Sequence, residues 1–139
     1  MRLGKDAKVE LIRHVPLFSR LSKKRLREVA AIADEIDVPA GKVLAKEGDR
    51  GREFFALLEG EVEVVQGGRL LRHMKEGEFF GEIALVTKVP RTATVTTVTP
   101  GRLLVITERD FGGLVKNTPD VGRAVAEALA ERLAPDLPV

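Results

Sequence analysis

Apolar residues recur at helical spacing in the first part of the chain. Over residues 23–33 they follow one another every three or four positions, and Ser22 just before them can cap a helix by accepting a hydrogen bond from its first turn. A shorter helical stretch is predicted over residues 8–14, and Pro16 stops it because proline cannot continue a helical hydrogen-bond ladder. The pattern therefore predicts a helical head over residues 8–33.

From about residue 35 the pattern changes to short apolar segments separated by glycines. Val62 and Val64 alternate with Glu61 and Glu63, as in a strand with one buried face. The sequence QGGR at residues 66–69 favours a tight hairpin turn. The predicted strands are 35–38, 43–46, 54–58, 62–66, 70–74, 92–98 and 103–107. Many short strands that do not alternate with helices favour an antiparallel β-barrel or jelly roll, a double-stranded β-helix, over residues 35–107.

Helical signals return after residue 107. Thr118, Pro119 and Asp120 are typical of a helix start, with a capping hydroxyl, a proline in the first turn and an acid that suits the helix dipole. An amphipathic helix is predicted over residues 119–134, before Pro135. Its apolar stripe consists of Val121, Val125, Ala128, Leu129 and Leu133. The chain is therefore predicted to be a single, mainly β domain over residues 1–139, flanked by N-terminal helices and by C-terminal helices at 108–134.

The composition excludes several classes of chemistry. The chain contains no cysteine, so thiol catalysis, disulfides and cysteine-bound metals are ruled out. Its two histidines, His14 and His73, are far apart in sequence, which leaves little material for a metal site or an acid–base relay. A metal-dependent β-barrel enzyme would need clustered histidine and carboxylate ligands. We therefore expect no catalytic residue, no metal, no resident cofactor and no enzymatic activity.

The charge of the chain is nearly balanced. With 23 basic and 21 acidic residues, the formal net charge of +2 permits a small anionic ligand but does not argue for nucleic acid. The basic cluster of the head is Arg20, Lys23, Lys24, Arg25 and Arg27, and it is interpreted as the solvated side of a helix. No apolar run approaches the roughly 20 residues that span a bilayer, and no signal-like core follows the N-terminus. A cytoplasmic protein without a membrane partner is expected.

The most specific chemistry lies in residues 79–95, with the sequence FFGEIALVTKVPRTATV. Gly81 allows a close backbone approach at the end of a strand. Residues 82–86 can form one short helical turn whose first N–H groups are unpaired. Arg91 follows a proline, and strand alternation is expected to place its side chain on the apolar inner face together with Ala93.

An arginine inside a small barrel is costly unless it is paired. A guanidinium fits two phosphate oxygens, and a carboxylate at Glu82 suits a sugar hydroxyl better than a bare phosphate. A sugar and a phosphate held side by side indicate a nucleotide. The alternative is that Glu82 and Arg91 form an ordinary ion pair that braces a loop, but the surrounding glycine, turn and proline favour a ligand site.

The same segment resembles the phosphate-binding cassette of the cyclic nucleotide-binding domain family, which includes bacterial catabolite activators, kinase regulatory subunits and cyclic nucleotide-gated channels. The pattern F-G-E-[IL]-A-L and then P-R-[TSA]-A-[TS]-V is matched without a gap, within a similarity that runs from about Leu11 to Leu133. The resemblance implies that Arg91 binds the equatorial phosphate oxygens and that Glu82 accepts from the ribose 2′-hydroxyl beside the Gly81 backbone. It further implies phosphate contacts from the backbone N–H groups of Ile83, Ala84 and Ala93, and a base wall of Val62, Val64 and Leu71, for which a role in the core is the alternative.

The base preference and the lid are less closely defined by the resemblance. Thr92 carries a hydroxyl. In family members selective for cyclic GMP, a hydroxyl at this position reaches the guanine amino group, but bacterial members that respond to cyclic AMP also carry serine or threonine there. Cyclic AMP is favoured over cyclic GMP as the ligand. The region that closes the pocket in relatives corresponds to residues 132–137, where Arg132, Leu133 or Leu137 can touch the base.

The resemblance implies a sensor module in which ligand binding shifts the flanking helices, with a homodimer or a partner protein contacted through the C-terminal helix. Because the chain ends at Val139 without a helix-turn-helix, no direct nucleic-acid binding is expected. One alternative is the effector-binding fragment of a catabolite-activator-type transcription factor. Another is a scaffold of the same fold that has lost its ligand, against which the intact Glu82 and Arg91 argue.

Overall fold

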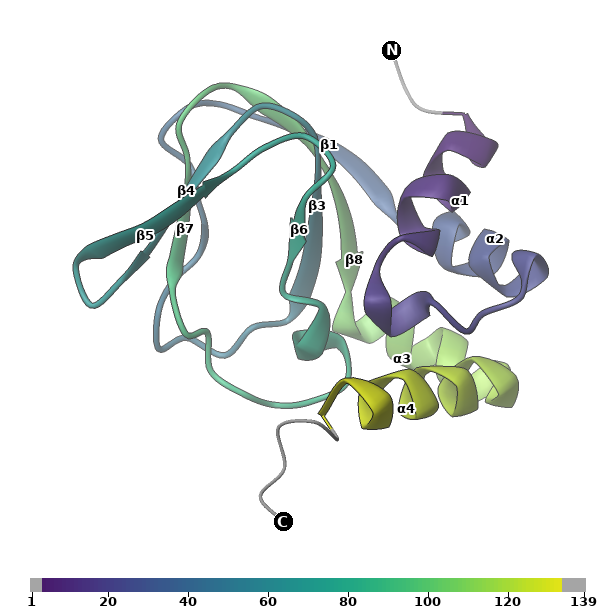
Figure 1. Ribbon diagram of the computed structural model, residues 1–139. Helices are drawn as coiled ribbons and strands as arrows, with labels where there is room; N and C mark the ends of the chain where they lie inside the picture. Colours follow the sequence, from purple (N-terminus) through teal and green to yellow (C-terminus); the bar gives the residue numbers. More distant parts are fainter. Residues whose placement is uncertain (1–3, 134–139) are drawn as a thin grey trace. The chain divides into compact units, whose positions relative to one another are not determined.

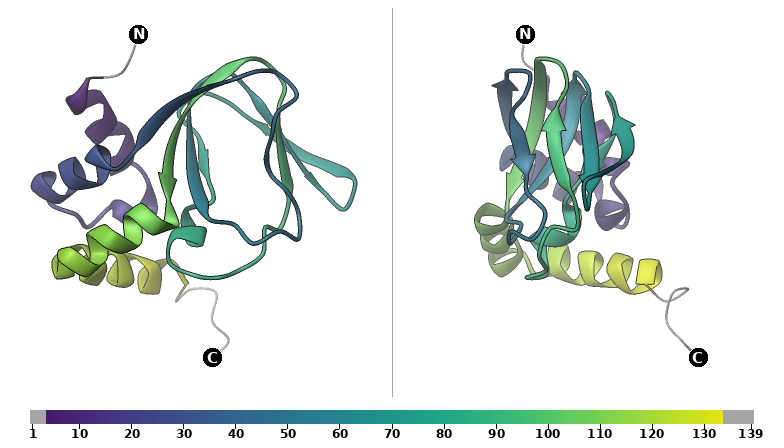
Figure 2. Two further views of the ribbon diagram at one scale, coloured as in Figure 1. Left: turned by 180° about the vertical axis from the view of Figure 1, so that it is seen from behind. Right: turned by 90° about the vertical axis from the view of Figure 1, so that its left-hand side faces the viewer.

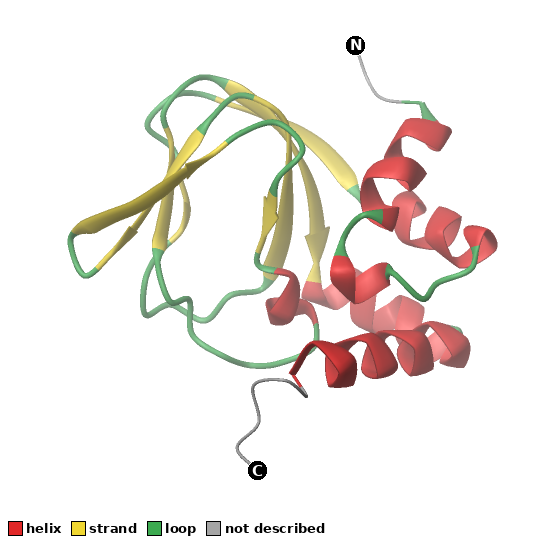
Figure 3. Cartoon of the chain, viewed as in Figure 1, coloured by secondary structure: helices red, strands yellow, loops and turns green. Residues whose placement is uncertain are grey.

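The computed structural model describes residues 4–133 and divides the chain into two compact units. The barrel unit consists of residues 33–109, and the helical unit combines residues 4–32 with residues 110–133. Figure 1 follows the chain through both units, and Figure 3 separates helices from strands. No helix within the described residues is both long and apolar enough to cross a membrane.

Eight short strands form the barrel unit, as the glycine-punctuated pattern predicts. They are β1 (Asp34–Val38), β2 (Val43–Ala45), β3 (Glu53–Glu59), β4 (Val62–Gln66), β5 (Arg69–Met74), β6 (Phe79–Phe80), β7 (Thr94–Thr97) and β8 (Gly101–Thr107). They pair antiparallel in two four-stranded sheets, in the orders β1-β8-β3-β6 and β2-β7-β4-β5. The two sheets face each other (Figures 1 and 2), so the predicted jelly-roll barrel is confirmed.

Apolar side chains from both sheets fill the interior of the barrel unit. Val62 is fully buried, and Val64 on the same strand is partly buried against the same cluster. Phe55 on β3 stacks on Phe80 on β6, with ring centroids 5.0 Å apart. The buried cluster consists of Val38, Ala45, Phe55, Leu57, Val62, Met74, Val95, Leu103 and Val105. Burial of this apolar surface is the main force that closes the two sheets on each other.

Glycine turns join the strands where the sequence places them. Gly67 and Gly68 have φ angles of +56° and +77°, the left-handed pair that a two-residue hairpin between β4 and β5 requires. This hairpin extends beyond the rest of its sheet (Figures 1 and 2). The turn glycines at 41, 48, 60, 77 and 81 also have positive φ, as their spacing in the sequence suggests.

The helical unit contains α1 (Lys5–Arg13), the 3₁₀ turn η1 (Pro16–Phe18), α2 (Lys23–Ala31), most of α3 (Glu108–Asn117) and α4 (Pro119–Leu133). Ser22 caps α2 as predicted, because its Oγ accepts a hydrogen bond of 3.3 Å from the Arg25 N–H. Val121 and Val125 of the predicted α4 stripe are buried, and α4 packs on η1 of the same chain. This part of the stripe therefore lies in the core of the unit and is not an exposed surface for a partner.

Several predicted boundaries need correction. Strand β7 begins at Thr94 rather than at residue 92, and the two-residue strand β6 was not predicted. Helix α2 ends at Ala31, short of residue 33, because Ile32 already leaves helical geometry with ψ near 4°. The end of the helix predicted over 119–134 lies outside the described residues, which reach Leu133.

Candidate functional site

Arg91 lies in the link between the cassette turn and β7, and its backbone is fixed on both sides. Its N–H donates to the Asp49 carbonyl at 2.7 Å, and its own carbonyl accepts from the Gly48 N–H at 2.9 Å. One residue earlier, Pro90 forms an isolated bridge with Arg50. These contacts attach the arginine to the 48–50 turn, which lies far from it in the sequence.

The Arg91 side chain points into the protein, where only 10% of it is exposed. Its Nη2 donates to the Glu53 carbonyl at 2.7 Å, and the same nitrogen lies 3.9 Å from the Glu53 carboxylate. A Cβ at Gly51 would lie 2.6 Å from Cζ of Arg91, and a Cβ at Gly81 would collide with its Nη1 and lie 2.7 Å from the Glu53 carbonyl. Two glycines therefore form a slot that holds the flat guanidinium.

The electrostatics of this slot favour an anionic ligand. Burial lowers the pKa of the Arg91 guanidinium from its ordinary value, and the nearby charge of Glu53 opposes that shift. The Glu53 side chain is 44% exposed, so water screens much of its attraction for the arginine. The site therefore holds a partly dehydrated cation that a closer anion would stabilise.

The side chain of Arg91 points inward as expected, but strand alternation is not the cause. Arg91 lies three residues before β7, so strand alternation does not determine where its side chain points. Hydrogen bonding to Glu53 and the two glycines place it instead. The ion pair formed by Arg91 is with Glu53, not with Glu82, so the structure does not support a simple Glu82–Arg91 loop brace.

The predicted short turn is present as the 3₁₀ turn η2 (Glu82–Leu85), and Gly81 precedes it with φ of +83°. Within the turn the Ala84 N–H already donates to the Gly81 carbonyl at 3.1 Å. Among the described residues, the N–H groups of Ile83 and Ala93 have no protein acceptor. Glu82 is 4% exposed, which is rare for a carboxylate without a functional or structural reason.

The residues predicted to contact the base are less uniform in their environment. Val62 is completely buried in the barrel core, which is the structural role left open for it, while Val64 is partly buried. Leu71 on β5 is 51% exposed. Thr92 is exposed, and its carbonyl accepts a hydrogen bond of 2.9 Å from Nε2 of Gln66. The predicted lid at residues 132–137 lies outside the residues whose side chains the structure describes.

Three residues of this site escaped the sequence analysis: Gly51, Glu53 and Gln66. Gly51 and Glu53 lie just before the predicted strand at 54–58, and only the fold brings them to Arg91. The signal in the sequence was weak, since a glycine and an acid before a strand are common in any turn. Gln66 is the last residue of β4, and in the sequence it is both the end of the predicted strand 62–66 and the start of the hairpin turn, so nothing marks it as a contact of the cassette.

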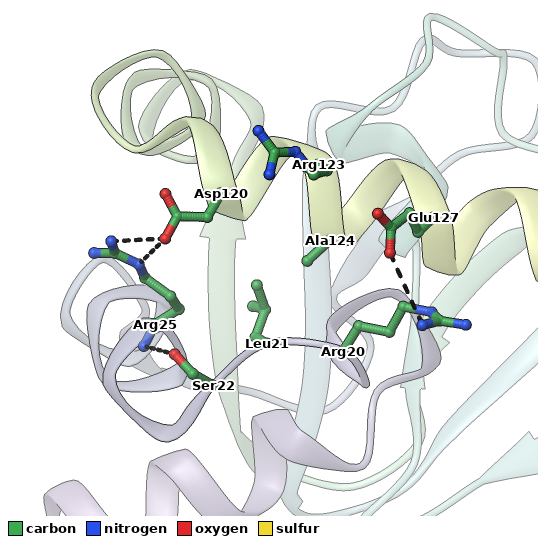
Figure 4. Close-up of a pocket in the computed structure, with 8 residues that line it drawn as sticks. All are labelled: Arg20, Leu21, Ser22, Arg25, Asp120, Arg123, Ala124 and Glu127. Atoms are coloured by element: carbon green, nitrogen blue, oxygen red, sulfur yellow. Dashed lines mark hydrogen bonds and ion pairs between the residues drawn. The ribbon is translucent and has the colours of Figure 1, made fainter.

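A hollow lies within the helical unit, between the start of α2 and α4 (Figure 4). It measures about 270 Å³, and its lining residues are Arg20, Leu21, Ser22, Arg25, Asp120, Arg123, Ala124 and Glu127. Nη2 of Arg25 lies 2.8 Å from Asp120, and Nη1 of Arg20 lies 3.9 Å from Glu127. Because these arginines already have carboxylate partners, the hollow is better described as an ion-paired seam than as an anion site. The structure shows no group of three or more His, Asp or Glu residues placed to hold a metal among residues 4–133.

Comparison with known proteins places the cassette in a defined family. Residues 35–118 match the family model described as "Cyclic nucleotide-binding domain". The chain is 33% identical over 123 residues to a cyclic nucleotide-gated potassium channel of Rhizobium etli, and the aligned part covers 88% of this chain and 34% of the channel. It thus spans about a third of the length of that curated relative.

Two solved structures resemble the chain closely. One is the N-terminal domain of a transcriptional regulator from Streptomyces coelicolor, with a TM-score of 0.82, 30% identity and coverage of 91% of this chain and 94% of that one. The other is the regulatory domain of Toxoplasma gondii PKA crystallised with cAMP, with a TM-score of 0.71, 31% identity and coverage of 81% and 45%. The fold of this chain is thus found both in a transcriptional regulator and in a kinase regulatory domain.

Proposed function

Because this chain belongs to the cyclic nucleotide-binding domain family, we propose that its cassette binds a cyclic nucleotide, cyclic AMP in preference to cyclic GMP. The observation that carries the proposal is Arg91, whose side chain is only 10% exposed and whose guanidinium lies in a slot between Gly51 and Gly81. Its backbone is clamped to the 48–50 turn, so the charged group is in place before any ligand arrives.

The phosphate is proposed to dock against the guanidinium of Arg91. A cyclic phosphate diester carries one negative charge and two free oxygens, which matches a guanidinium fork. The N–H groups of Ile83 and Ala93 supply donors, and in the described part of the chain they have no protein acceptor. The phosphate would come closer to Arg91 than the Glu53 carboxylate at 3.9 Å, so the ligand would become the main counter-ion of the arginine.

Glu82 is proposed to accept a hydrogen bond from the ribose 2′-hydroxyl. Its burial supports this role, because a carboxylate in a low-dielectric site forms strong hydrogen bonds with a hydroxyl donor. Gly81 with φ of +83° turns the chain at this point and brings the backbone beside the carboxylate. Val64 and Leu71 then remain as candidates for contact with the base, whereas Val62 lies within the core.

The preference for cyclic AMP rests on relatives and is the finer part of the proposal. The Toxoplasma gondii regulatory domain was crystallised with cAMP at 31% identity. As a module without chemistry of its own, the domain would report the ligand through its flanking helices. The similarity to the N-terminal domain of a Streptomyces regulator favours a second form of this role, as the effector-binding part of a longer transcriptional regulator.

Calorimetric titration with cyclic AMP and cyclic GMP tests the proposal. We expect saturable binding of both, tighter for cyclic AMP, and a loss of several kcal/mol (roughly 2–4) in Arg91→Ala, because the phosphate loses its charged partner. The matched control is Arg102→Ala. Arg102 belongs to the same unit, and its Nε donates to Asp37 at 3.1 Å. The affinity of this variant for cyclic AMP should stay within about twofold of the parent. Failure of the parent to bind either nucleotide, or equal affinities of parent and Arg91→Ala, contradicts the proposal.

A further inference from the structure

Gln66 links the hairpin of the barrel unit to the cassette. The backbone ladder between β4 and β7 ends at the Val65–Thr94 pair. One residue beyond that pair, the side chain of Gln66 continues the connection, because its Nε2 donates to the Thr92 carbonyl at 2.9 Å. A carbonyl can only accept, so the amide must present its nitrogen here. Thr92 is thus held by a side chain where the sheet no longer holds it.

The other side of the hairpin is tied to the same segment. The Gly67 N–H donates to Oε1 of Glu47 at 2.9 Å, and the Glu47 N–H donates to Oγ1 of Thr94 at 3.0 Å. Residues 91–94 therefore have contacts with the 48–49 turn, with Glu47 and with Gln66. Of these, the Gln66 bond is the one that acts directly on Thr92.

We propose that Gln66 is a positioning residue that sets the base preference of the site by orienting Thr92; this inference rests on the proposed function. The hydrogen bond to its carbonyl restrains the backbone of Thr92, and the backbone conformation limits the rotamers open to its hydroxyl. Thr92 follows Arg91 directly and is exposed, and the proposal places the base of a nucleotide bound at Arg91 beside the Thr92 hydroxyl. Gln66 itself touches the backbone of Thr92 and acts through it.

The chemistry of the two bases makes the effect selective. Guanine carries an exocyclic amino group that a hydroxyl oxygen can accept from, whereas adenine has no group at the corresponding carbon. An oriented Thr92 hydroxyl therefore supports cyclic GMP and adds little for cyclic AMP. In this arrangement Gln66 limits the preference for cyclic AMP, because it keeps cyclic GMP as a competent second ligand.

The test is a comparison of dissociation constants for the two nucleotides in Gln66→Met, which keeps the length of the side chain and removes the donor. We expect cyclic GMP to bind about 3- to 10-fold more weakly, the worth of one hydrogen bond, while cyclic AMP changes by less than about twofold. Gln66→Lys restores a donor and should recover most of the loss. Arg69→Met, at the partner position across the hairpin, is the matched control and should change neither constant.

A double-mutant cycle separates this role from a general structural one. In a Thr92→Val background, Gln66→Met should have no further effect on the ratio of the two constants, because the hydroxyl that it orients is absent. Equal weakening of both nucleotides, an unchanged ratio in Gln66→Met, or a persistent effect in the Thr92→Val background each overturns the role of Gln66 while leaving the proposed function in place. A parent protein that binds neither nucleotide overturns both.

Discussion

Gly51 offers a steric test of the arginine slot that leaves every charged group in place. A Cβ at this position would lie 2.6 Å from Cζ and 2.9 Å from Cδ of Arg91, well inside the contact distance of about 3.5 Å at which carbon atoms pack. The guanidinium must therefore move by about 1 Å in Gly51→Ala (about 3.5 minus 2.6). A shift of that size converts the 2.7 Å hydrogen bond to the Glu53 carbonyl into a contact too long to count as one.

Gly51→Ala should weaken ligand binding more than it lowers the stability of the fold. The atoms that a new methyl group meets belong to a flexible side chain, so the fold can yield, but the arginine no longer points at the position proposed for the phosphate. We expect the displaced guanidinium to lose one hydrogen bond to the phosphate. A hydrogen bond to a charged group contributes about 1.5–3 kcal/mol, so the affinity for cyclic AMP should fall roughly 10- to 150-fold. Isothermal titration calorimetry measures this loss, and thermal unfolding shows whether the variant remains folded.

Gly112→Ala is the matched control for this experiment. Gly112 lies within α3, where a Cβ would meet nothing within 4 Å, and alanine favours a helix more than glycine does. Its affinity for cyclic AMP should equal that of the parent, with equal or higher thermal stability. If Gly51→Ala binds within about twofold of the parent while remaining folded, the slot does not control the position of Arg91 and the reasoning is refuted.

Three further predictions follow from the same contacts. Glu82→Gln should mainly reduce discrimination against 2′-deoxy cyclic AMP, measured as the ratio of dissociation constants, because the amide is a weaker acceptor for the ribose hydroxyl. Glu53→Gln should tighten binding of cyclic AMP about two- to fivefold, since it removes a solvent-screened carboxylate 3.9 Å from Arg91 that competes with the phosphate; weaker binding would contradict this. Arg25 lowers the pKa of Asp120, so this carboxylate stabilises the fold above the ordinary aspartate pKa and loses that contribution as the pH falls through its lowered value. The difference in free energy of unfolding between the parent and Asp120→Asn, from denaturant titrations, should therefore shrink with falling pH, and a difference independent of pH would contradict the pairing.

Local patterns were sufficient to predict most of the barrel. Strand β4 was predicted with its full extent because alternating valines and glutamates mark both of its faces, and the two glycines after it can adopt left-handed angles that other residues disfavour. Strand β6 could not be predicted because two adjacent phenylalanines show no periodic pattern. It is a strand only because it pairs with Phe55 and Ala56 of β3, a contact that the local sequence does not encode.

The site shows a different division between local and distant information. Local chemistry was enough to propose Arg91 and Glu82 as site residues, because these two charged residues stand among a glycine, a short turn and a proline in a largely apolar segment. The environment of the arginine comes from the 48–53 segment, which meets it only after the barrel closes. Strand alternation predicted the inward orientation of Arg91 correctly but for the wrong reason, since Arg91 lies before β7. The placement of Arg91 therefore depends on Gly51 and Glu53, so a chain with the same cassette and different residues at these two positions should hold the arginine differently.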